Sequence, residues 1–173
     1  MNEVLQAILT RRSVRSFTGQ KIEKDILKQL ADAARYAPSA MNRQTWKFTV
    51  VSNPDCLRDL AAAISAHLHR GSDYNFYGAT ALILASNERD NPHGTEDCAC
   101  ALENIFLAAH SLGIGSVWIN QLKGICDEPA IRAVLDRLHL PPNHIVLGMA
   151  ALGYPSAPPA AVEKREDVVE YID

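Results

Sequence analysis

The chain has 173 residues, of which 47% are hydrophobic and 21% charged, a composition typical of one soluble globular domain rather than of a disordered or fibrous protein. Its 17 basic and 20 acidic residues leave a net charge of −3, so neither nucleic acid nor an anionic membrane is an expected partner. Only 6% of the residues are aromatic, which argues against stacking surfaces for single-stranded nucleic acid.

The cysteines do not have the pattern of a disulfide framework. A chain of this length can form a core without covalent links, so we expect free thiols in a reducing compartment. Cys98 and Cys100 lie two residues apart in a predicted helix and therefore point to different faces, which disfavours a metal site there. Because the first residues do not resemble a signal peptide, we expect no cleavable leader. The longest apolar run, Ala79–Ala85, is too short to span a bilayer. We expect a cytoplasmic protein.

Periodicity predicts a chain in which helices and strands alternate. Apolar residues at helical spacing predict helices at about residues 2–10, 23–36, 53–68, 95–112 and 127–138. Alternating or short apolar runs predict strands at residues 46–51, 80–85, 117–119 and 145–152. Asn53 and Asp127 are the expected N-caps of their helices, and Gly113 is expected to close the fourth helix.

The last residues, 156–173, form a tail with a proline pair, a charge cluster and a strand-like end at 168–172. This tail is too short to be a domain and too apolar at its end to remain free. We therefore expect it to dock on another surface, such as that of a second subunit.

The order of elements by itself predicts a doubly wound parallel sheet. Such a sheet would carry a glycine-rich phosphate loop after its first strand, but Val51 is followed by Ser52-Asn53-Pro54. The close glycines Gly113 and Gly115 follow a helix instead. A Rossmann nucleotide site is therefore disfavoured.

Two polar clusters could carry chemistry. Arg11-Arg12-Ser13-Val14-Arg15 offers three guanidinium groups and a hydroxyl, which match the oxygens of a phosphate; the alternative is a solvated basic turn. Residues 37–44 present a serine, an asparagine and a glutamine that suit the edge of a neutral heteroaromatic ring; the alternative is an ordinary turn.

Together these clusters resemble a known family. The run Arg11 to Phe17, the run Ala33 to Gln44 and the following Trp46 are similar to the N-terminal signature of the nitroreductase-like FMN-dependent oxidoreductases. Residues 108–118 and 151–155 match further motifs in the expected order. The resemblance spans nearly the whole chain and indicates a compact member of the family, with a single FMN-binding domain over residues 1–173.

The resemblance implies an α+β fold with a mixed, mainly antiparallel sheet flanked by helices, in place of the parallel sheet. It also implies a homodimer with FMN at the subunit interface and a C-terminal segment exchanged with the partner subunit, as 168–172 could be.

The same resemblance assigns the cofactor-binding residues. The phosphate, the ribityl chain and the pyrimidine edge of FMN would be bound by Arg11, Arg12, Ser13 and Arg15. The other subunit would hold the ring through Pro38, Ser39, Met41, Asn42 and Gln44. A cation near the chain end completes the phosphate site in the family; the candidates are Lys164 and Arg165, of which we prefer Arg165, and the alternative is a solvated tail charge.

Two further segments are implied with less detail. Trp118, Ile119, Asn120 and Gln121 match a stretch over the flavin edge at N5 and O4, where some relatives have glutamate and glycine in place of the last two. Asn75 lies near the position at which relatives keep an amide or a lysine beside the pyrimidine ring. The neighbouring Tyr74, Phe76 and Tyr77 could belong to the core or face the substrate.

The implied activity is a ping-pong reaction in which NADH or NADPH reduces the flavin at N5 and a nitroaromatic, a quinone or a similar small acceptor reoxidises it. No catalytic side chain is expected, because the cofactor carries the chemistry. The alternatives are a flavin-handling protein that stores, senses or fragments FMN without turning over NAD(P)H, and a colourless dimer that keeps the fold for binding.

Overall fold

The computed structural model describes residues 2–165 and 167–172, so the predicted tail is described without Glu166 and Asp173. The helices are α1 (Glu3–Thr10), α2 (Lys24–Arg35), α3 (Pro54–His67), α4 (Gly94–Ser111) and α5 (Pro129–Arg137). The strands are β1 (Lys47–Val51), β2 (Ala81–Glu88), β3 (Gly115–Ile119) and β4 (His144–Gly153). Two single 3-10 turns are η1 (Ala40–Asn42) and η2 (Phe76–Gly78). Each of these helices and strands lies where the sequence predicts one, although β2 continues to Glu88 instead of ending at Ala85.

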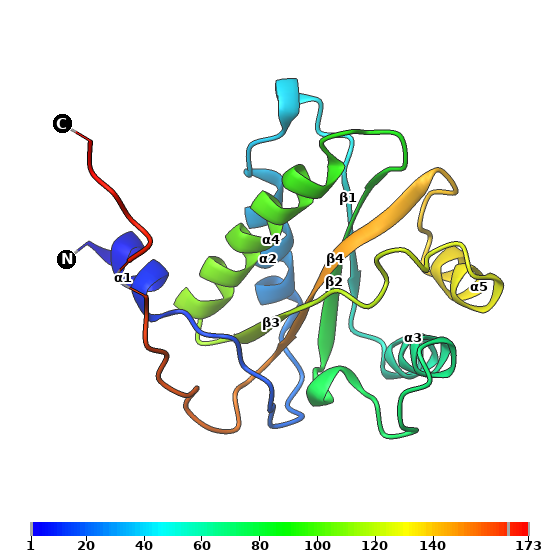
Figure 1. Cartoon of the computed structure of the whole chain (residues 1–173). Coiled ribbons are helices and arrows are strands. Elements are labelled where there is room, and N and C mark those ends of the chain that lie inside the picture. The colour runs from blue at the N-terminus through cyan, green and yellow to red at the C-terminus, as the bar shows by residue number, and fades with distance from the viewer. Residues whose placement is uncertain (1, 166, 173) are drawn as a thin grey trace.

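The strands form one sheet in the order β1-β2-β4-β3, and every neighbouring pair is antiparallel (Figure 1). The parallel sheet predicted from element order is therefore wrong, and the mainly antiparallel sheet implied by the resemblance is confirmed. Val51 at the end of β1 pairs with Leu82 near the start of β2. The connection through α3 therefore starts and ends at the same end of the sheet. In a parallel crossover, the connection would end at the opposite end of the sheet.

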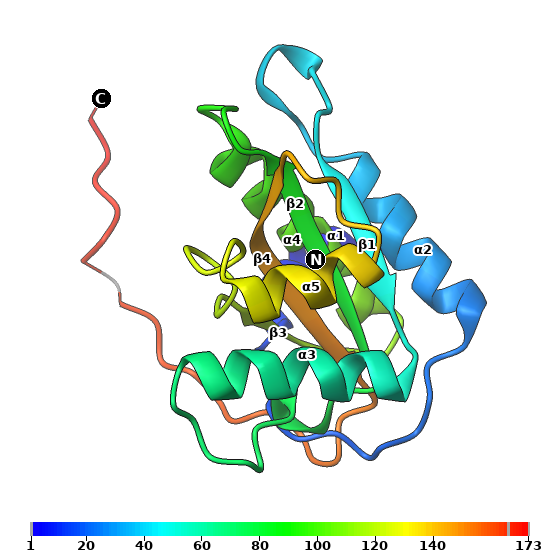
Figure 2. The ribbon, with the colours of Figure 1, turned by 90° about the vertical axis from the view of Figure 1, so that its right-hand side faces the viewer.

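Helices cover both faces of the sheet. Figure 2 shows α3 and α5 in front of the sheet and α4 behind it, where α4 packs with α2. Along β2, Ile83 and Ala85 belong to the core under α2 and α4, and Leu82 and Leu84 belong to the core under α3 and α5. A central strand buried on both faces is continuously apolar, the pattern that is also typical of parallel sheets. The apolar run of β2 therefore did not contradict the parallel sheet that the order of elements predicted.

Two of the three predicted helix ends are confirmed. Asn53 Oδ1 accepts from Asp55 N at 2.8 Å, and Gly113 follows α4 with a φ of 73°. The third prediction is wrong, because Glu128 is the N-cap of α5 and makes no side-chain cap bond. Asp127 instead forms an ion pair with Arg89.

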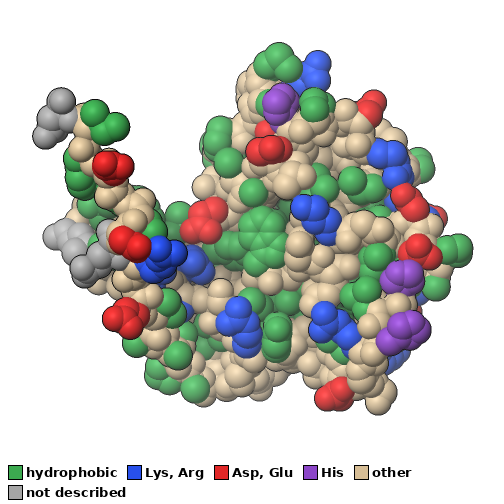
Figure 3. Space-filling model, viewed as in Figure 1, with side chains coloured by type: hydrophobic (Ala, Val, Ile, Leu, Met, Phe, Trp, Pro, Cys, Tyr) green, Lys and Arg blue, Asp and Glu red, His purple; other side chains and the backbone are tan. Residues whose placement is uncertain are grey.

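The tail forms no strand within its own chain over the residues that the structure describes, so the predicted strand at 168–172 is absent from the single subunit. Figures 2 and 3 show the tail standing off from the body. Four apolar side chains near its end are at least 64% exposed: Val168, Val169, Tyr171 and Ile172. Pairing of this segment with a second subunit stays a prediction.

The first helix is also poorly covered. α1 has no buried residue, and its apolar side chains Val4, Leu5, Ile8 and Leu9 are exposed. The helix is held to α4, where Thr10 Oγ1 lies 2.8 Å from His110 Nε2. Both ends of the chain therefore expose apolar surface.

Candidate functional site

An extended N-terminal arm, residues 11–18, lies along β3 and the end of β4. Val14 N donates to Ser116 O, and Thr18 N donates to Tyr154 O, each at 2.9 Å. The contact at Ser116 runs parallel, so the sheet becomes mixed when the arm is counted. These bonds satisfy backbone groups of β3 and hold the arm extended.

Two glycines allow the arm to approach the sheet closely. A Cβ at Gly153 would lie 2.8 Å from the ring of Phe17, and a Cβ at Gly115 would lie 3.0 Å from the side chain of Val14. Cβ atoms in proteins rarely lie this close to another heavy atom, so an added Cβ would force the neighbouring side chain to move. Glycine at these two positions therefore sets the distance between the arm and the sheet.

Side chains of the arm alternate between the sheet and solvent. Val14 is 7% exposed, whereas its neighbours Ser13 and Arg15 are exposed. Among the described residues, no carboxylate lies within ion-pair distance of Arg15. Arg15 therefore presents an uncompensated positive charge to solvent or to a ligand.

A pocket of about 160 Å³ lies where the arm meets β3 and α4. Its lining consists of Arg11, Ser13, Glu103, Phe106, Ser116, Val117 and Trp118. Arg11 Nε lies 3.5 Å from Glu103 Oε1. The structure thus brings the predicted Arg11, Ser13 and Trp118 together beside an aromatic wall.

Arg12 is the one member of the basic cluster that turns back on the chain. Its guanidinium donates to Leu9 O at 2.8 Å and to Arg11 O at 2.7 Å, where α1 ends. In this structure Arg12 therefore stabilises carbonyl groups at the end of α1. Contact between Arg12 and a cofactor stays a prediction.

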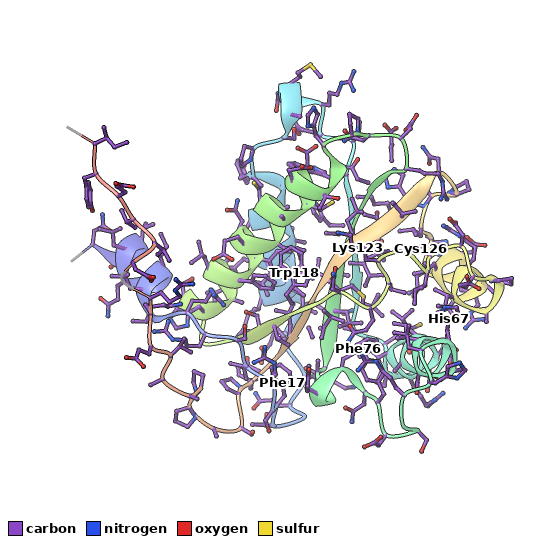
Figure 4. The ribbon with its side chains drawn as sticks, viewed as in Figure 1. Phe17, His67, Phe76, Trp118, Lys123 and Cys126 are labelled. Carbon is purple, nitrogen blue, oxygen red and sulfur yellow. The ribbon has the colours of Figure 1, made fainter. Side chains whose placement is uncertain are left out.

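The end of β3 forms a second part of the site. Trp118 lies on the α4 side of the sheet, with its ring centre 6.0 Å from that of Phe106. Figure 4 shows Phe17 and Phe76 below it, and Figure 3 shows hydrophobic and basic side chains mixed on the surface that faces the viewer. Trp118 is 39% exposed and lies over Gly148, where a Cβ would come within 2.9 Å of the indole. Ile119 is buried, so only its backbone could meet a ligand.

The two residues after β3 differ in environment. Asn120 is exposed, and Gln121 is half-buried. Within the described part of the chain, Gln121 Oε1 is buried without a hydrogen-bond partner. A buried carbonyl oxygen without a donor is costly, so this atom is suited to accept a hydrogen bond from a ligand or a water molecule.

The second predicted cluster lies in a loop, residues 38–44, far from the arm. Figures 1 and 2 both show η1 at the top of the molecule and the arm near the bottom. Met41, Asn42 and Gln44 have φ values of 52°, 54° and 52°, in the left-handed region. Ser39 Oγ accepts from Gln44 N, and Gln44 Nε2 donates to Asn42 Oδ1. Pro38, Met41, Asn42 and Gln44 are exposed, so the loop presents apolar and polar side chains away from its own arm.

A buried carboxylate that the sequence analysis missed anchors this loop. Asp97, in the first turn of α4, is 4% exposed and accepts from Ala40 N at 2.8 Å. Asn91 Nδ2 donates to the other carboxylate oxygen at 3.4 Å and to Thr45 Oγ1 at 3.1 Å. An acidic residue in the first turn of a helix is common, because it interacts favourably with the helix dipole, so Asp97 did not stand out in the sequence. Its contact with Ala40, 57 residues away, leaves no pattern in the local sequence.

The remaining predicted residues lie apart from the arm pocket. Asn75 caps η2 by accepting from Gly78 N, and it lines a second, larger cavity. Lys164 and Arg165 lie in the exposed tail, where Arg165 forms an ion pair with Asp167 at 2.7 Å. The structure therefore collects one half of the predicted residues at the arm and β3, whereas the loop 38–44 and the tail lie on other surfaces and Asn75 lines a separate cavity.

The cysteines are free thiols, as predicted, and their environments differ. Cys98 is buried and Cys100 is exposed on the opposite side of α4. Burial raises the pKa of the Cys98 thiol to about 12, with the nearby Asp97 carboxylate adding to the shift. Cys98 therefore remains a protonated core residue at neutral pH.

In the described residues, no helix combines the length and the hydropathy needed to cross a bilayer.

Comparison with known proteins identifies the family. The model of the nitroreductase family matches residues 8–154. A protein of Archaeoglobus fulgidus with the provisional name NADH dehydrogenase/NAD(P)H nitroreductase is 34% identical over 158 residues, which cover 90% of this chain and 87% of the relative.

Solved structures share the whole fold. The crystal structure of a nitroreductase with bound FMN from Bacteroides fragilis superposes with a TM-score of 0.93 at 39% identity and full coverage of both chains. A nitroreductase with bound FMN from Desulfitobacterium hafniense gives a TM-score of 0.88 at 27% identity, also with full coverage of both chains. The family match, the sequence identity and the fold agree with the resemblance noted in the sequence, and the chain belongs to the nitroreductase family.

Proposed function

We propose that this protein is an FMN-dependent oxidoreductase that passes electrons from NADH or NADPH to a small organic acceptor such as a nitroaromatic compound or a quinone. The observation that carries the proposal is that the half-buried Arg11 and the exposed Ser13 line one pocket with Trp118, next to the exposed Arg15 of the same arm. The Bacteroides fragilis and Desulfitobacterium hafniense relatives, which have the same fold, bind FMN. In this proposal the chain is one flavin-binding domain over residues 1–173 and acts in the cytoplasm.

The chemistry of the arm and of β3 fits FMN. Guanidinium groups match phosphate oxygens in geometry and charge, and the hydroxyl of Ser13 adds a donor. The indole of Trp118 offers an apolar surface to a ring system. The unsatisfied Gln121 Oε1 offers an acceptor for a ring N–H group such as N3–H, which adjoins O4 of the flavin. A phosphate, a planar ring and a polar ring edge are the parts of FMN that need these partners.

Different residues would bind different parts of FMN. Arg11, Arg12 and Ser13 would bind the phosphate and the ribityl chain, and Arg15 the pyrimidine edge. The backbone of Ile119, with Trp118, Asn120 and Gln121, would line the ring edge at N5 and O4. Asn75 would lie beside the pyrimidine, and Lys164 or Arg165 would complete the phosphate site.

A second copy of the chain would supply the rest of the site. The loop 38–44 is held by internal hydrogen bonds and exposes polar side chains, but it lies far from the arm of its own subunit, which supports its use by a partner. The exposed apolar residues of α1 and of the tail offer surface for a homodimer. Residues 168–172 would pair with the partner's sheet.

When bound, FMN supplies hydride chemistry at N5, accepting from the nicotinamide and giving to the acceptor in ping-pong order. Arg15 would stabilise negative charge at the pyrimidine edge and so favour uptake of electrons. The loop 38–44 would hold the ring plane and leave one face open to both substrates in turn. An open, partly apolar face would bind several kinds of small organic electron acceptor.

The test is the visible absorbance spectrum of the purified protein after addition of FMN, followed by anaerobic addition of NADH and of NADPH. We expect flavin bands that bleach with at least one donor and return when a quinone is added. Bands that persist with both donors would reject the reductase and leave a flavin-handling protein. A protein that does not retain FMN would reject both.

A further inference from the structure

A cavity of about 850 Å³ lies apart from the arm pocket, between α3 and the segment 70–80. Gly19 and Lys21, which precede α2, close another side of it. A volume of this size is typical of small-molecule sites. Of the residues assigned to FMN, only Asn75 lines this cavity.

Asn75 connects this cavity with the proposed flavin site. It lies on the cavity wall, and it is the residue expected beside the pyrimidine ring. Its side chain is fixed, since Asn75 Oδ1 accepts from Gly78 N at 3.0 Å. A molecule whose reactive ring lies on the flavin could therefore extend past Asn75 into the cavity.

The cavity wall is basic. It carries Lys21, Arg58 and Arg70 against one carboxylate, Asp73. Arg58 is paired with Asp55 at 2.8 Å, whereas Lys21 and Arg70 have no carboxylate within ion-pair distance among the described residues. Two uncompensated cations on one concave surface attract an anion such as a phosphate or a diphosphate.

Aromatic surface lies next to these cations. Arg70 Cζ is 5.5 Å from the centre of the Tyr74 ring, and Tyr74 meets Phe76 edge to face with ring centres 5.2 Å apart. The apolar side chains of Leu57 and Ala61 on α3 also line the cavity. A flat heteroaromatic group would find apolar surface here, beside charged groups for its phosphates.

The basic segment is held in place from α3. The buried Ser65 donates from its hydroxyl to the carbonyl oxygens of Arg70 and Gly71, each at 3.0 Å. These bonds fix the backbone at Arg70 relative to α3. The cavity is therefore a formed site and does not depend on ordering of a loop by the ligand.

We propose that this cavity binds the adenosine diphosphate half of the nicotinamide donor, an inference that rests on the proposed function. Lys21 and Arg70 would bind the diphosphate, the Tyr74 and Leu57 side of the cavity would take the adenine, and Asp73 would accept from ribose hydroxyls. The nicotinamide half would pass Asn75 to reach the flavin. Specificity for the dinucleotide would then come from residues outside the flavin site.

The test compares whole donors with truncated ones in the FMN-loaded enzyme. The donors are NADH, NADPH and reduced nicotinamide mononucleotide, which lacks the adenosine half. The variants are Lys21→Gln, Arg70→Gln and their combination, with Lys24→Gln, an exposed lysine on α2, as the matched control. We expect the KM for the dinucleotides to rise on the order of tenfold in each single variant, with kcat and the KM for the mononucleotide unchanged.

A second measurement does not depend on turnover. Equilibrium dialysis with ADP and with 2′,5′-ADP should detect binding to the FMN-loaded enzyme that the double variant loses and Lys24→Gln keeps. A preference for the second ligand would indicate recognition of the 2′-phosphate of NADPH, and equal binding would indicate recognition of the adenosine 5′-phosphate that both ligands share. Reduction of flavin by neither donor would reject the proposed function, while loss of ADP binding in the double variant would still support the cavity.

Two results would overturn the inference. If KM rises equally for the dinucleotides and for the mononucleotide, the variants act on the flavin site and not on an adenosine site. If KM and ADP binding are the same in all variants, the cavity does not take the donor.

Discussion

Asp97 accepts a hydrogen bond from the backbone of Ala40 at 2.8 Å, and this single contact joins the buried start of α4 to the loop 38–44. The loop contains three residues in the left-handed region, each of which carries a conformational cost. A carboxylate that is 4% exposed and bonded to the first turn of the loop offsets this cost. The shape of the loop therefore depends on a residue that would not itself touch the flavin.

We expect Asp97→Ala to lower the free energy of unfolding by about 2 kcal/mol, because the Ala40 N–H loses a charged partner in a buried position. Urea unfolding would measure this loss. Asp97→Asn keeps an acceptor oxygen and should lose less. The control is Glu96→Gln, which removes the neighbouring exposed carboxylate and should leave stability within about 0.5 kcal/mol. Equal stability of Asp97→Ala and the control would remove Asp97 from its anchoring role.

Gly153→Ala is expected to displace the arm. The added Cβ would lie 2.8 Å from the Phe17 ring, so the ring must move and the arm with it. We expect a destabilisation of roughly 1–3 kcal/mol together with weaker FMN binding, measured by thermal unfolding and by flavin fluorescence titration. Phe17→Ala combined with Gly153→Ala relieves the clash. If FMN affinity is normal in Gly153→Ala, the position of the arm does not determine binding.

Arg15→Ala tests the charge that faces the proposed flavin. We expect FMN to bind on the order of tenfold more weakly and its reduction potential to fall. The fold should persist, because Arg15 is exposed and contributes nothing to the core. Lys24→Ala removes the same charge from the exposed surface of α2 and should change neither quantity. An unaltered affinity and potential in Arg15→Ala would exclude it from the site.

Deletion of residues 166–173 tests the exchanged tail. The exposed apolar side chains of this segment are expected to contact a partner subunit, so their loss should shift the protein from dimer toward monomer. Sedimentation over a range of concentrations would measure the shift. The matched control keeps the length and replaces Glu163 and Lys164, upstream in the same tail, by serine. A deletion protein that dimerises as tightly as the full chain would contradict the exchange.

Stability should depend on pH through His144. Burial lowers the pKa of this histidine below its ordinary value of about 6.5, and its Nδ1 lies 3.2 Å from Ser86 Oγ. Because the unfolded state then binds a proton more readily, stability is present above the ordinary pKa and is lost as the pH falls through it. Urea unfolding between about pH 7.5 and pH 5 should detect the loss.

The controls separate His144 from other groups. His144→Asn keeps a hydrogen-bonding group and should flatten the profile, whereas His93→Asn, at an exposed position, should not. Asp32 and Asp127 have pKa values held low by hydrogen bonds from Lys28 and Arg89, so they titrate at lower pH than this range. An identical slope in His144→Asn and the parent chain would assign the dependence to another group.

The elements of this chain could be predicted from local patterns because their determinants are local. Asn53-Pro54 starts α3, Gly113 ends α4, and apolar spacing marks each helix. The motifs of the arm and of the loop 38–44 also placed the chain in its family. Local patterns could not distinguish a strand buried on both faces of an antiparallel sheet from one in a parallel sheet, because burial produces the same apolar run in both, as β2 does.

By itself, the sequence determined which residues form helices and strands, the basic arm and the family. Only the tertiary structure decided the sheet order and the burial of Asp97 against Ala40. It also decided that Lys21, from before α2, and Arg70, from after α3, share one cavity. The physical reason is that such contacts join residues distant in sequence, and their energies depend on the packing of the whole chain.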